Sequence, residues 1–377
     1  MTSTIQKLNQ IGQSIWYDNI ERKLLKDGTL EGMFNRGVIR GITSNPSIFN
    51  KAISQSDEYD EEIKSLTREG LSRENVYENL AISDIQAAAD LFRPLYDQTD
   101  GGDGYVSLEV SPYLAHDPDQ TISEAKRLWS DVNRPNLLVK IPATKAGLPA
   151  ITETIAAGIN VNVTLIFSLD RYREVREAYL AGLEKRAFAE KPITNIASVA
   201  SFFISRIDSK VDKQLEALTK TATSEENGRI EGLMGKTAVA SGKLAFLDYE
   251  DTFGDNGTRF GKLKPQGAKR QRVLWASTST KNPEYPDTKY VEEMIGPLTI
   301  NTVPPNTLEA FLDHGVVERT IDQNLEEAHN VMADLSSLGI DLDQATLELE
   351  AEGVKSFADA YTSLLDSLQN RMIDFQK

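Results

Sequence analysis

The feature that most constrains the fold of this chain is a regular alternation of short apolar segments with helical segments. Helices are expected between the apolar segments because apolar residues such as Ile82, Ile85, Ala89 and Phe92 recur at helical spacing. Parallel strands joined by helices form α/β folds. We therefore predict a (β/α)8 TIM barrel, which needs about 250 residues. The eight expected strands are 14–20, 37–46, 105–112, 136–144, 158–168, 193–201, 271–279 and 298–303.

The 377 residues exceed the needs of a barrel, and the surplus is assigned to additions around one domain over 1–377. Extra helices are expected at both ends, over 3–12 and over the C-terminal extension 320–377. The Gly- and charge-rich segment 251–269 is expected to be a surface loop. An open doubly wound sheet is the structural alternative, but no strand leads into G-x-G-x-x-G and no G-x-x-x-x-G-K-[ST] occurs. No nucleotide cofactor is therefore expected.

Composition excludes several classes of function. The net charge of −16 disfavours nucleic acid and anionic membranes, so a phosphate-bearing ligand needs a local cluster of cations. The sequence has no cysteine, which excludes disulfides, thiolate nucleophiles and cysteine-held metals. His116, His314 and His329 lie far apart, and no metal site is expected. Without an apolar stretch of signal-peptide or membrane-spanning length, a cytoplasmic protein is expected; a homodimer is one assembly that the sequence allows.

Lys140 stands inside the apolar strand 136–144, Asn-Leu-Leu-Val-Lys-Ile-Pro-Ala-Thr. Successive side chains in a strand point to opposite faces, so Lys140 shares a face with Leu138, while Val139 and Ile141 occupy the other. An unpaired buried charge is costly and is usually relieved by loss of the proton, which leaves a nucleophilic amine. Such an amine forms Schiff bases with carbonyl compounds. The alternative is a lysine whose stem reaches a surface carboxylate.

Polar residues also gather at the ends of the other expected strands, where barrel enzymes place their active groups. Glu109 shares parity with Ser107, so its carboxylate is expected to point into the barrel, and Ser277 is in phase with Trp275. Taken singly, each serine is more often structural. The convergence of these residues indicates a site for a polyhydroxylated ligand. The strand-end candidates are Asp18, Thr43, Asn45, Glu109, Asn160, Asn162, Thr164, Ser201, Ser277 and Ser279.

Arg206 and Lys281 are the candidates for a local cationic pocket. Arg206 follows Ser201 by five residues, and Lys281 comes just after the seventh expected strand. Barrels often bind phosphate at the loops that follow their late strands. The alternative is that either cation is a solvated surface charge.

A buried amine with two separate carboxylates indicates carbonyl chemistry. Lys140 is the candidate nucleophile, one carboxylate would handle the carbinolamine proton, and the other would move a proton when a carbon–carbon bond breaks. The protonated imine itself would accept the electrons, so this chemistry requires no metal.

At this point the sequence resembles the transaldolase family. The resemblance rests on five motifs in chain order and spans Asp18 to about Lys281. The motifs are Thr-Ser-Asn-Pro-Ser at 43–47, Leu-Glu-Val at 108–110, Leu-Val-Lys-Ile at 138–141, Gly-Ile-Asn-Val-Asn-Val-Thr-Leu-Ile-Phe-Ser at 158–168 and Ala-Ser-Phe-Phe-Ile-Ser-Arg-Ile-Asp at 200–208.

The resemblance implies a Schiff base between Lys140 and C2 of fructose 6-phosphate or sedoheptulose 7-phosphate. It implies transfer of a dihydroxyacetone unit to an aldose phosphate, glyceraldehyde 3-phosphate or erythrose 4-phosphate, in the non-oxidative pentose phosphate pathway. Asp18 is then the base that removes the C4 hydroxyl proton. Glu109 is the acid/base for imine formation and hydrolysis, acting through a water held near Thr164.

The same resemblance implies how the substrate is held. Asn45, Asn162 and Ser201 would bind hydroxyls of the retained dihydroxyacetone unit, Phe203 would wall the pocket, and Arg206 would bind phosphate. Thr43 and Ser277 complete the expected substrate-binding residues.

One departure from the family concerns the end of the seventh expected strand. Many transaldolases have an arginine shortly after the serine there, whereas this chain reads Ser277-Thr-Ser-Thr-Lys281. Lys281 would take that place as a point charge without the bidentate fork of arginine.

Two other functions compete with transfer. A fructose 6-phosphate aldolase would release dihydroxyacetone to water, but Glu109 and Phe203 favour transfer. A non-catalytic phosphosugar-binding barrel is disfavoured by the presence of Lys140, Asp18 and Glu109 together.

Overall fold

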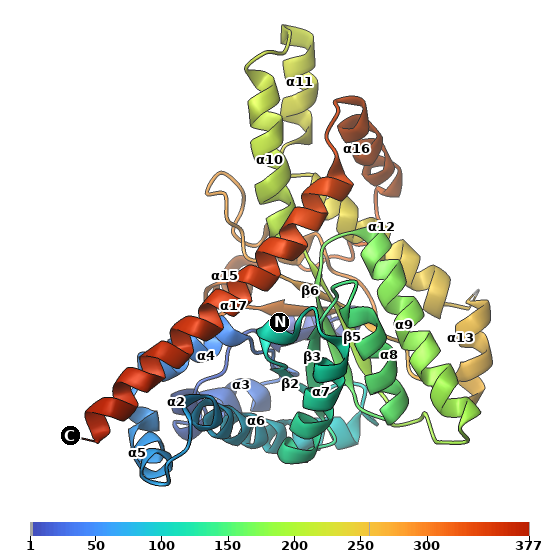
Figure 1. Cartoon of the computed structure of the whole chain (residues 1–377). Helices are drawn as coiled ribbons and strands as arrows, with labels where there is room; N and C mark the ends of the chain where they lie inside the picture. The colour runs from blue at the N-terminus through green and yellow to red at the C-terminus, as the bar shows by residue number, and fades with distance from the viewer. Residues whose placement is uncertain (1–2, 256, 377) are drawn as a thin grey trace.

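The computed structural model describes residues 3–255 and 257–376. At its centre is a seven-stranded parallel sheet in the order β1-β7-β6-β5-β4-β3-β2 (Figure 1). The strands are β1 Ser14–Tyr17, β2 Val106–Glu109, β3 Leu137–Pro142, β4 Val161–Ile166, β5 Ser198–Phe203, β6 Arg272–Ala276 and β7 Ile300–Val303. All the carboxyl ends therefore lie at one edge of the sheet.

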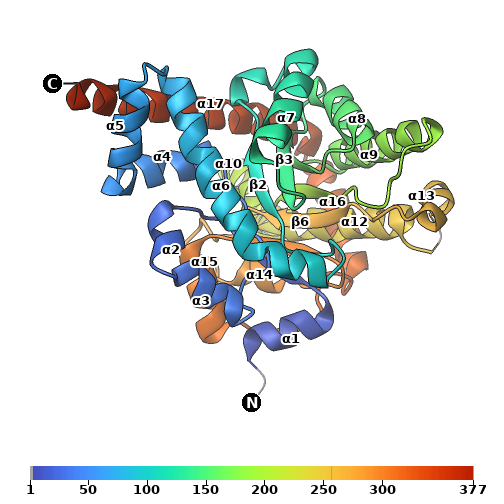
Figure 2. The ribbon, with the colours of Figure 1, turned by 90° about the horizontal axis from the view of Figure 1, so that it is seen from below.

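Helices connect and surround the strands, so the parallel α/β fold is confirmed (Figure 2). The helices are α1 Thr4–Ile11, α2 Arg22–Lys26, α3 Thr29–Asn35, α4 Pro46–Ser54, α5 Asp60–Arg68, α6 Arg73–Gln98, α7 Pro118–Val132, α8 Gly147–Ala157, α9 Leu169–Phe188, α10 Ser205–Thr219, α11 Ser224–Leu233, α12 Thr237–Phe253, α13 Thr258–Leu263, α14 Lys289–Glu292, α15 Pro305–His314, α16 Leu325–Ser337 and α17 Leu342–Phe375. Three 3₁₀ turns are Asp57–Tyr59, Pro112–Leu114 and Lys264–Gln266.

The segment 37–46, expected as the second strand, does not form a regular strand. Ile42 alone makes parallel bridges, one to Tyr17 of β1 and one to Val106 of β2, the two edge strands of the sheet. Before it, Gly41 lies so close to the Trp16 ring that a Cβ atom there would come within 2.7 Å of it. After it, Asn45 caps α4 and ends the extended backbone. The segment thus lies between β1 and β2, the two edge strands, and pairs with them as a bridge instead of as a regular strand.

The segment 251–269 is more ordered than the expected loop. The end of α12, the helix α13 and the 3₁₀ turn Lys264–Gln266 occupy most of it. Phe260 and Leu263 of α13 are buried, which explains why the segment folds onto the protein instead of looping into solvent. The other observed deviation is β5, which begins at Ser198 because residues 193–197 form a turn closed by Ile196 N–H and the Ile193 carbonyl.

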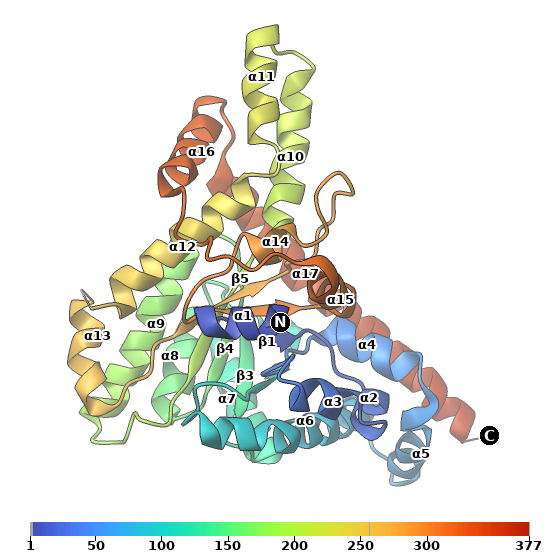
Figure 3. The same cartoon turned by 180° about the vertical axis from the view of Figure 1, so that it is seen from behind.

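The C-terminal extension is helical, as predicted, and consists of α16 and α17. Figure 1 shows α17 running past α4 and α10, while the α10–α11 pair and α16 project from one side; Figure 3 shows the same arrangement from behind. Gly353 of α17 packs against Leu165, which lies within a register shift of β4 and has a left-handed φ of 60°. This contact brings the middle of α17 to the carboxyl ends of the strands. In the described part of the chain, no helix is long and apolar enough to cross a membrane.

Candidate active site

The carboxyl ends of the strands surround a cavity of 190 Å³. Parallel α/β folds place their ligands at this edge, because side chains from several strands and loops converge there. Every predicted site residue except Glu109, Asn160 and Asn162 lines the cavity. The lining residues are Asp18, Thr43, Asn45, Lys140, Thr164, Ser201, Phe203, Arg206, Ala276, Ser277, Ser279, Lys281, Thr302, Pro304 and Phe357.

Lys140 is held at the floor of this cavity by β3, of which every residue is buried. The side chain of Lys140 is 6% exposed, and its Nζ donates to the Ser44 carbonyl at 3.0 Å. Nζ also lies 3.4 Å from Oε2 of Glu109 and 5.5 Å from the ring centre of Phe357. The amine is therefore shielded from bulk water but reachable from the cavity, where it can act as a nucleophile.

Glu109 ends β2, and the strand register places it beside Lys140. Its side chain is 5% exposed, and burial raises its pKa to about 7, against the opposing pull of Lys140 and with a smaller contribution from Asp18. The contact between Lys140 Nζ and Glu109 Oε2 is an ion pair without hydrogen-bond geometry. Oε2 of Glu109 therefore has no hydrogen-bond partner among the described residues. Glu109 can thus hold or release a proton near neutral pH at the lysine nitrogen.

Asp18 follows β1 and faces the same cavity. Its carboxylate accepts a hydrogen bond from Thr43 Oγ1 at 2.6 Å, and Thr43 Oγ1 lies 2.6 Å from Thr302 Oγ1. Because the one hydroxyl proton of Thr43 goes to Asp18, Thr302 must be the donor in the second bond. Burial raises the pKa of Asp18, while Lys140, Thr43 and Lys281 oppose the shift. Asp18 is therefore an oriented candidate base.

Asn162 lies beneath the cavity and belongs to a hydrogen-bonded chain across three strands. Its amide donates to Ser107 Oγ at 3.0 Å, and its carbonyl oxygen accepts from Ser201 Oγ at 2.7 Å. Thr164 reaches the cavity wall, and its buried Oγ1 has no partner among the described residues. Asn160, on the same face of β4, points to the other end of the sheet, where it bonds to the carbonyls of Pro135 and Leu137.

Ser277 reaches the cavity for a different reason from the predicted one. The expectation that it shares a face with Trp275 is wrong, because Trp275 is fully buried away from the cavity. Ser277 has a left-handed φ of 55°, which interrupts the alternation of β6. The turn brings Ser277 Oγ to 3.1 Å from Ser205 Oγ at the start of α10.

Arg206 and Lys281 make the opposite end of the cavity cationic. Burial lowers the pKa of Arg206; burial and the nearby charge of Arg206 lower that of Lys281. Among the described residues Arg206 forms no ion pair and packs 5.5 Å from the ring centre of Phe203, while Lys281 donates to Ser279 Oγ at 2.7 Å. The start of α10 has no side-chain cap, and the N–H groups of Ser205 and Ile207 bond to the carbonyls of Ser277 and Ile204. This end can bind an anion such as phosphate.

Asn45 contributes to the cavity wall at the start of α4. Its side-chain oxygen accepts from the Ile48 N–H at 3.0 Å, so it caps the helix. Only the amide NH₂ of Asn45 is then available to donate to a ligand.

Sequence reasoning missed Thr302 and Phe357. Thr302 sits at the end of β7, and the rule that strand ends carry the site residues could have found it. Phe357 lies in the middle of α17, where an apolar residue on a helix face is indistinguishable from a core residue.

The fold and the cavity define an α/β protein with its candidate site at the carboxyl ends of a parallel sheet. The chain belongs to the family described as Transaldolase/Fructose-6-phosphate aldolase, whose model matches residues 15–368. The transaldolase of Parafrankia sp. is 46% identical over 99% of both chains. That of Trichodesmium erythraeum is 44% identical over 99% of this chain and 98% of its own, and that of Thermobifida fusca is 45% identical over 99% of both. The predictions of the family and of a transaldolase enzyme are confirmed.

Proposed function

We propose that this chain transfers a dihydroxyacetone unit from sedoheptulose 7-phosphate or fructose 6-phosphate to glyceraldehyde 3-phosphate or erythrose 4-phosphate. The reaction would run through a Schiff base on Lys140 and serve the non-oxidative pentose phosphate pathway. The observation that carries the proposal is one buried amine with a carboxylate at 3.4 Å, on the floor of a cavity that ends in two cations. The names of relatives at 44–46% identity support the same activity.

The first half of the mechanism is imine formation. Lys140 passes a proton to Glu109, its amine attacks C2 of the ketose, and the carbinolamine hydroxyl leaves as water with that proton returned by Glu109. The raised pKa of Glu109, about 7, supports this role because its protonated form is well populated near neutral pH. Thr164, with its free hydroxyl on the cavity wall, would hold the water.

The second half is cleavage and transfer. Asp18 removes the C4 hydroxyl proton, the C3–C4 bond breaks, and its electron pair moves into the protonated imine to give an enamine. The aldose leaves, an acceptor aldehyde enters, and the steps reverse with Asp18 returning the proton. The bond from Thr43 to Asp18 supports an oriented base.

The remaining residues would bind the substrate. Asn45 and Ser201 would hold hydroxyls of the retained unit, with Asn162 bonded behind Ser201, and Phe203 would form the wall. The phosphate would lie between Arg206 and Lys281. The charge of Arg206 lowers the pKa of Lys281, and Arg206 forms no ion pair among the described residues, which supports this assignment. Thr43 and Ser277 would complete the lining.

The fold and the setting are part of the proposal. Because Ile42 bridges both sheet edges, we interpret the fold as a (β/α)8 barrel whose second strand is reduced to a bridge. One hydrophobic core extends from Ile5 to Met372, which supports a single domain over 1–377. The proposal includes a cytoplasmic location and no cofactor, and a homodimer is one assembly that the sequence allows.

Borohydride trapping tests the mechanism. Reduction in the presence of fructose 6-phosphate should leave a three-carbon adduct on the peptide that contains Lys140, read by mass spectrometry. An unmodified Lys140 in active enzyme contradicts the proposal.

The alternative is fructose 6-phosphate aldolase activity, which the description of the matching family also names. Cleavage of fructose 6-phosphate is therefore assayed with and without erythrose 4-phosphate. A transaldolase requires the acceptor for turnover, whereas cleavage at the same rate without it indicates the aldolase.

A further inference from the structure

Phe357 of the C-terminal helix is the aromatic side chain at the Lys140 end of the substrate cavity. Among the described lining residues, Phe203 and Phe357 are the aromatic ones. Phe203 lies at the cationic end, where the guanidinium of Arg206 is 5.5 Å from its ring centre. Phe357 lies at the other end, with Nζ of Lys140 over its ring at the same distance of 5.5 Å.

The ring of Phe357 covers the cavity side of the lysine nitrogen. Away from the cavity, Nζ donates to the Ser44 carbonyl at 3.0 Å and lies 3.4 Å from Oε2 of Glu109. An ammonium has three N–H groups, so these two contacts leave one N–H for the cavity side. Phe357 lines the cavity and is 5% exposed. Water could approach this side of Nζ only by displacing an apolar ring that is packed in place.

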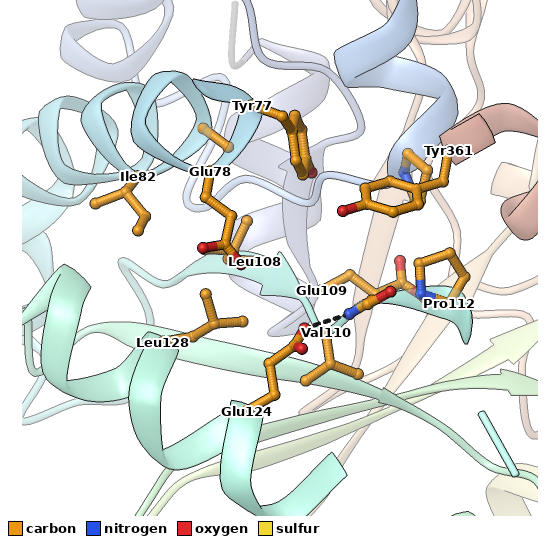
Figure 4. A pocket seen from close by; sticks show the side chains of 13 residues that line it. Tyr77, Glu78, Ile82, Leu108, Glu109, Val110, Pro112, Glu124, Leu128 and Tyr361 are labelled. Carbon is orange, nitrogen blue, oxygen red and sulfur yellow. Dashed lines mark hydrogen bonds between the residues drawn. The ribbon is translucent and has the colours of Figure 1, made fainter. Parts of the chain in front are cut away.

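Contacts on both sides of Phe357 hold α17 against the protein. Before it, Glu350 forms an ion pair with Arg171 of α9 at 3.0 Å, and both side chains are largely buried. After it, Tyr361 packs edge to face on Tyr77 of α6, with ring centroids 5.4 Å apart, as Figure 4 shows. The ring of Phe357 is therefore a fixed part of the cavity wall.

Exclusion of water at this point matters most after the carbon–carbon bond has broken. The aldose leaves, and the space that it occupied is open to water while the three-carbon enamine stays on Lys140. The enamine carbon C3 then either bonds to an acceptor aldehyde, which is transfer, or takes a proton, which leads to release of dihydroxyacetone. Closed sites protect reactive intermediates from such side reactions with water.

We propose that Phe357 is a specificity-determining residue that keeps water from the enamine and so favours transfer over release. The inference rests on the proposed Schiff base at Lys140. In release, a water relays to C3 the proton that Asp18 took from the C4 hydroxyl, which restores the protonated imine. A second water then gives its oxygen to C2, the C–N electron pair returns to Nζ, and the two water protons go to Nζ and Glu109.

The ratio of release to transfer tests the inference. Release is the dihydroxyacetone formed from fructose 6-phosphate alone, and transfer is the sedoheptulose 7-phosphate formed when erythrose 4-phosphate is added. Phe357→Ala leaves space beside polar groups that water can fill, so the ratio should rise about 10-fold or more. Phe357→Leu keeps most of the apolar volume, so its ratio should stay within about 3-fold of wild type. The ratio does not depend on how much of each variant is folded.

Alanine and leucine both favour helix, so α17 should be retained in both variants. If Phe357→Ala is insoluble, Phe357→Val is measured in its place, with a ratio between those expected for leucine and alanine. A wild-type ratio in the smallest soluble variant overturns the inference.

Phe375→Ala is the matched control. Phe375 lies near the other end of the same helix, and Nζ of Lys64 is 4.9 Å from its ring centre, but it does not line the substrate cavity. Its loss should leave the ratio unchanged. An equal rise in Phe375→Ala would show that loosening of α17 is sufficient, which also overturns the inference. A wild-type enzyme that gives no borohydride adduct on Lys140 instead overturns the proposed function.

Discussion

The two ends of the substrate cavity differ in how their charged side chains are paired. At the Lys140 end, oppositely charged groups are buried together: Nζ lies 3.4 Å from Glu109, and Asp18 accepts a 2.6 Å bond from Thr43. At the other end, Arg206 and Lys281 share a wall, and burial lowers the pKa of both, while the charge of Glu352 opposes the shift at Arg206. Arg206 forms no ion pair among the described residues. One end can exchange protons internally, and the other is left with charge for a ligand to neutralise.

This difference separates chemistry from anchoring. Changes at the Lys140 end should act on the rate of bond making and breaking, because the proposed mechanism places the groups there at the reacting atoms. Changes at the cationic end should act on affinity for phosphate. Substitutions at each end therefore test whether chemistry and anchoring are separate.

The largest effect is expected from Lys140→Arg. Arginine keeps a positive charge beside Glu109 but has no nucleophilic amine, so turnover should fall by at least about 10⁴-fold and adduct formation should vanish. Coupled assays of sugar transfer and borohydride trapping measure the two losses. Circular dichroism and thermal unfolding serve as controls for the fold. Turnover within 10²-fold of wild type would show that the amine is not the nucleophile.

Asp18→Asn should separate two steps at the same end. The amide keeps the shape and the contact with Thr43 but cannot accept the C4 proton, so transfer should slow about 10²- to 10⁴-fold. The proposed mechanism assigns imine formation to Lys140 and Glu109, so the substrate should still be trapped, now as the intact six-carbon adduct. A three-carbon adduct formed at the wild-type rate would exclude Asp18 as the base.

Much of the Lys140 end can be predicted from the sequence. The apolar run 136–144 specifies a buried strand, and alternation along β2 turns Glu109 inward beside Lys140. These inferences succeed because both strands have regular backbone and register. The position of Arg206 at the cavity could be predicted for a similar reason, because α10 begins directly after β5.

The parts that could not be predicted depend on irregular backbone or on distant contacts. The left-handed φ at Ser277 breaks the alternation on which its assignment relied. The segment 37–46 forms only a bridge at Ile42, although its composition suits a strand and backbone hydrogen bonds join it to both edges of the sheet. Phe357 reaches Lys140 because Gly353 fits against Leu165, a contact between α17 and a bulged β4 that no local pattern encodes.

Arg206→Met should weaken the anchoring end. Loss of a hydrogen bond from a charged group to phosphate should lower kcat/KM about 10- to 100-fold, mainly through KM. Competitive inhibition by inorganic phosphate should weaken by a similar factor. Lys281→Met should do the same to a smaller degree, since an ammonium lacks the bidentate fork. An unchanged KM with reduced kcat in Arg206→Met would place Arg206 in the chemistry instead.

The smallest effect should be on stability, and its pH dependence distinguishes the two ends. The pKa of Glu109 rises from 4.5 to about 7 on folding, so the folded protein holds this proton more tightly than the unfolded chain. The resulting destabilisation is absent below pH 4.5, grows as the pH rises and is complete above about pH 7. Glu109→Gln should therefore gain about 2 kcal/mol in free energy of unfolding relative to wild type between pH 5 and pH 8.

Arg206→Met provides the matched contrast in the same measurement. A guanidinium titrates far above this range, so removing it should shift the free energy of unfolding by the same amount at pH 5 and pH 8. Urea unfolding of wild type and both variants at the two pH values measures these differences. If Glu109→Gln also gave a pH-independent shift, the carboxyl of Glu109 would not titrate near neutrality, and proton exchange would not distinguish the Lys140 end from the cationic end.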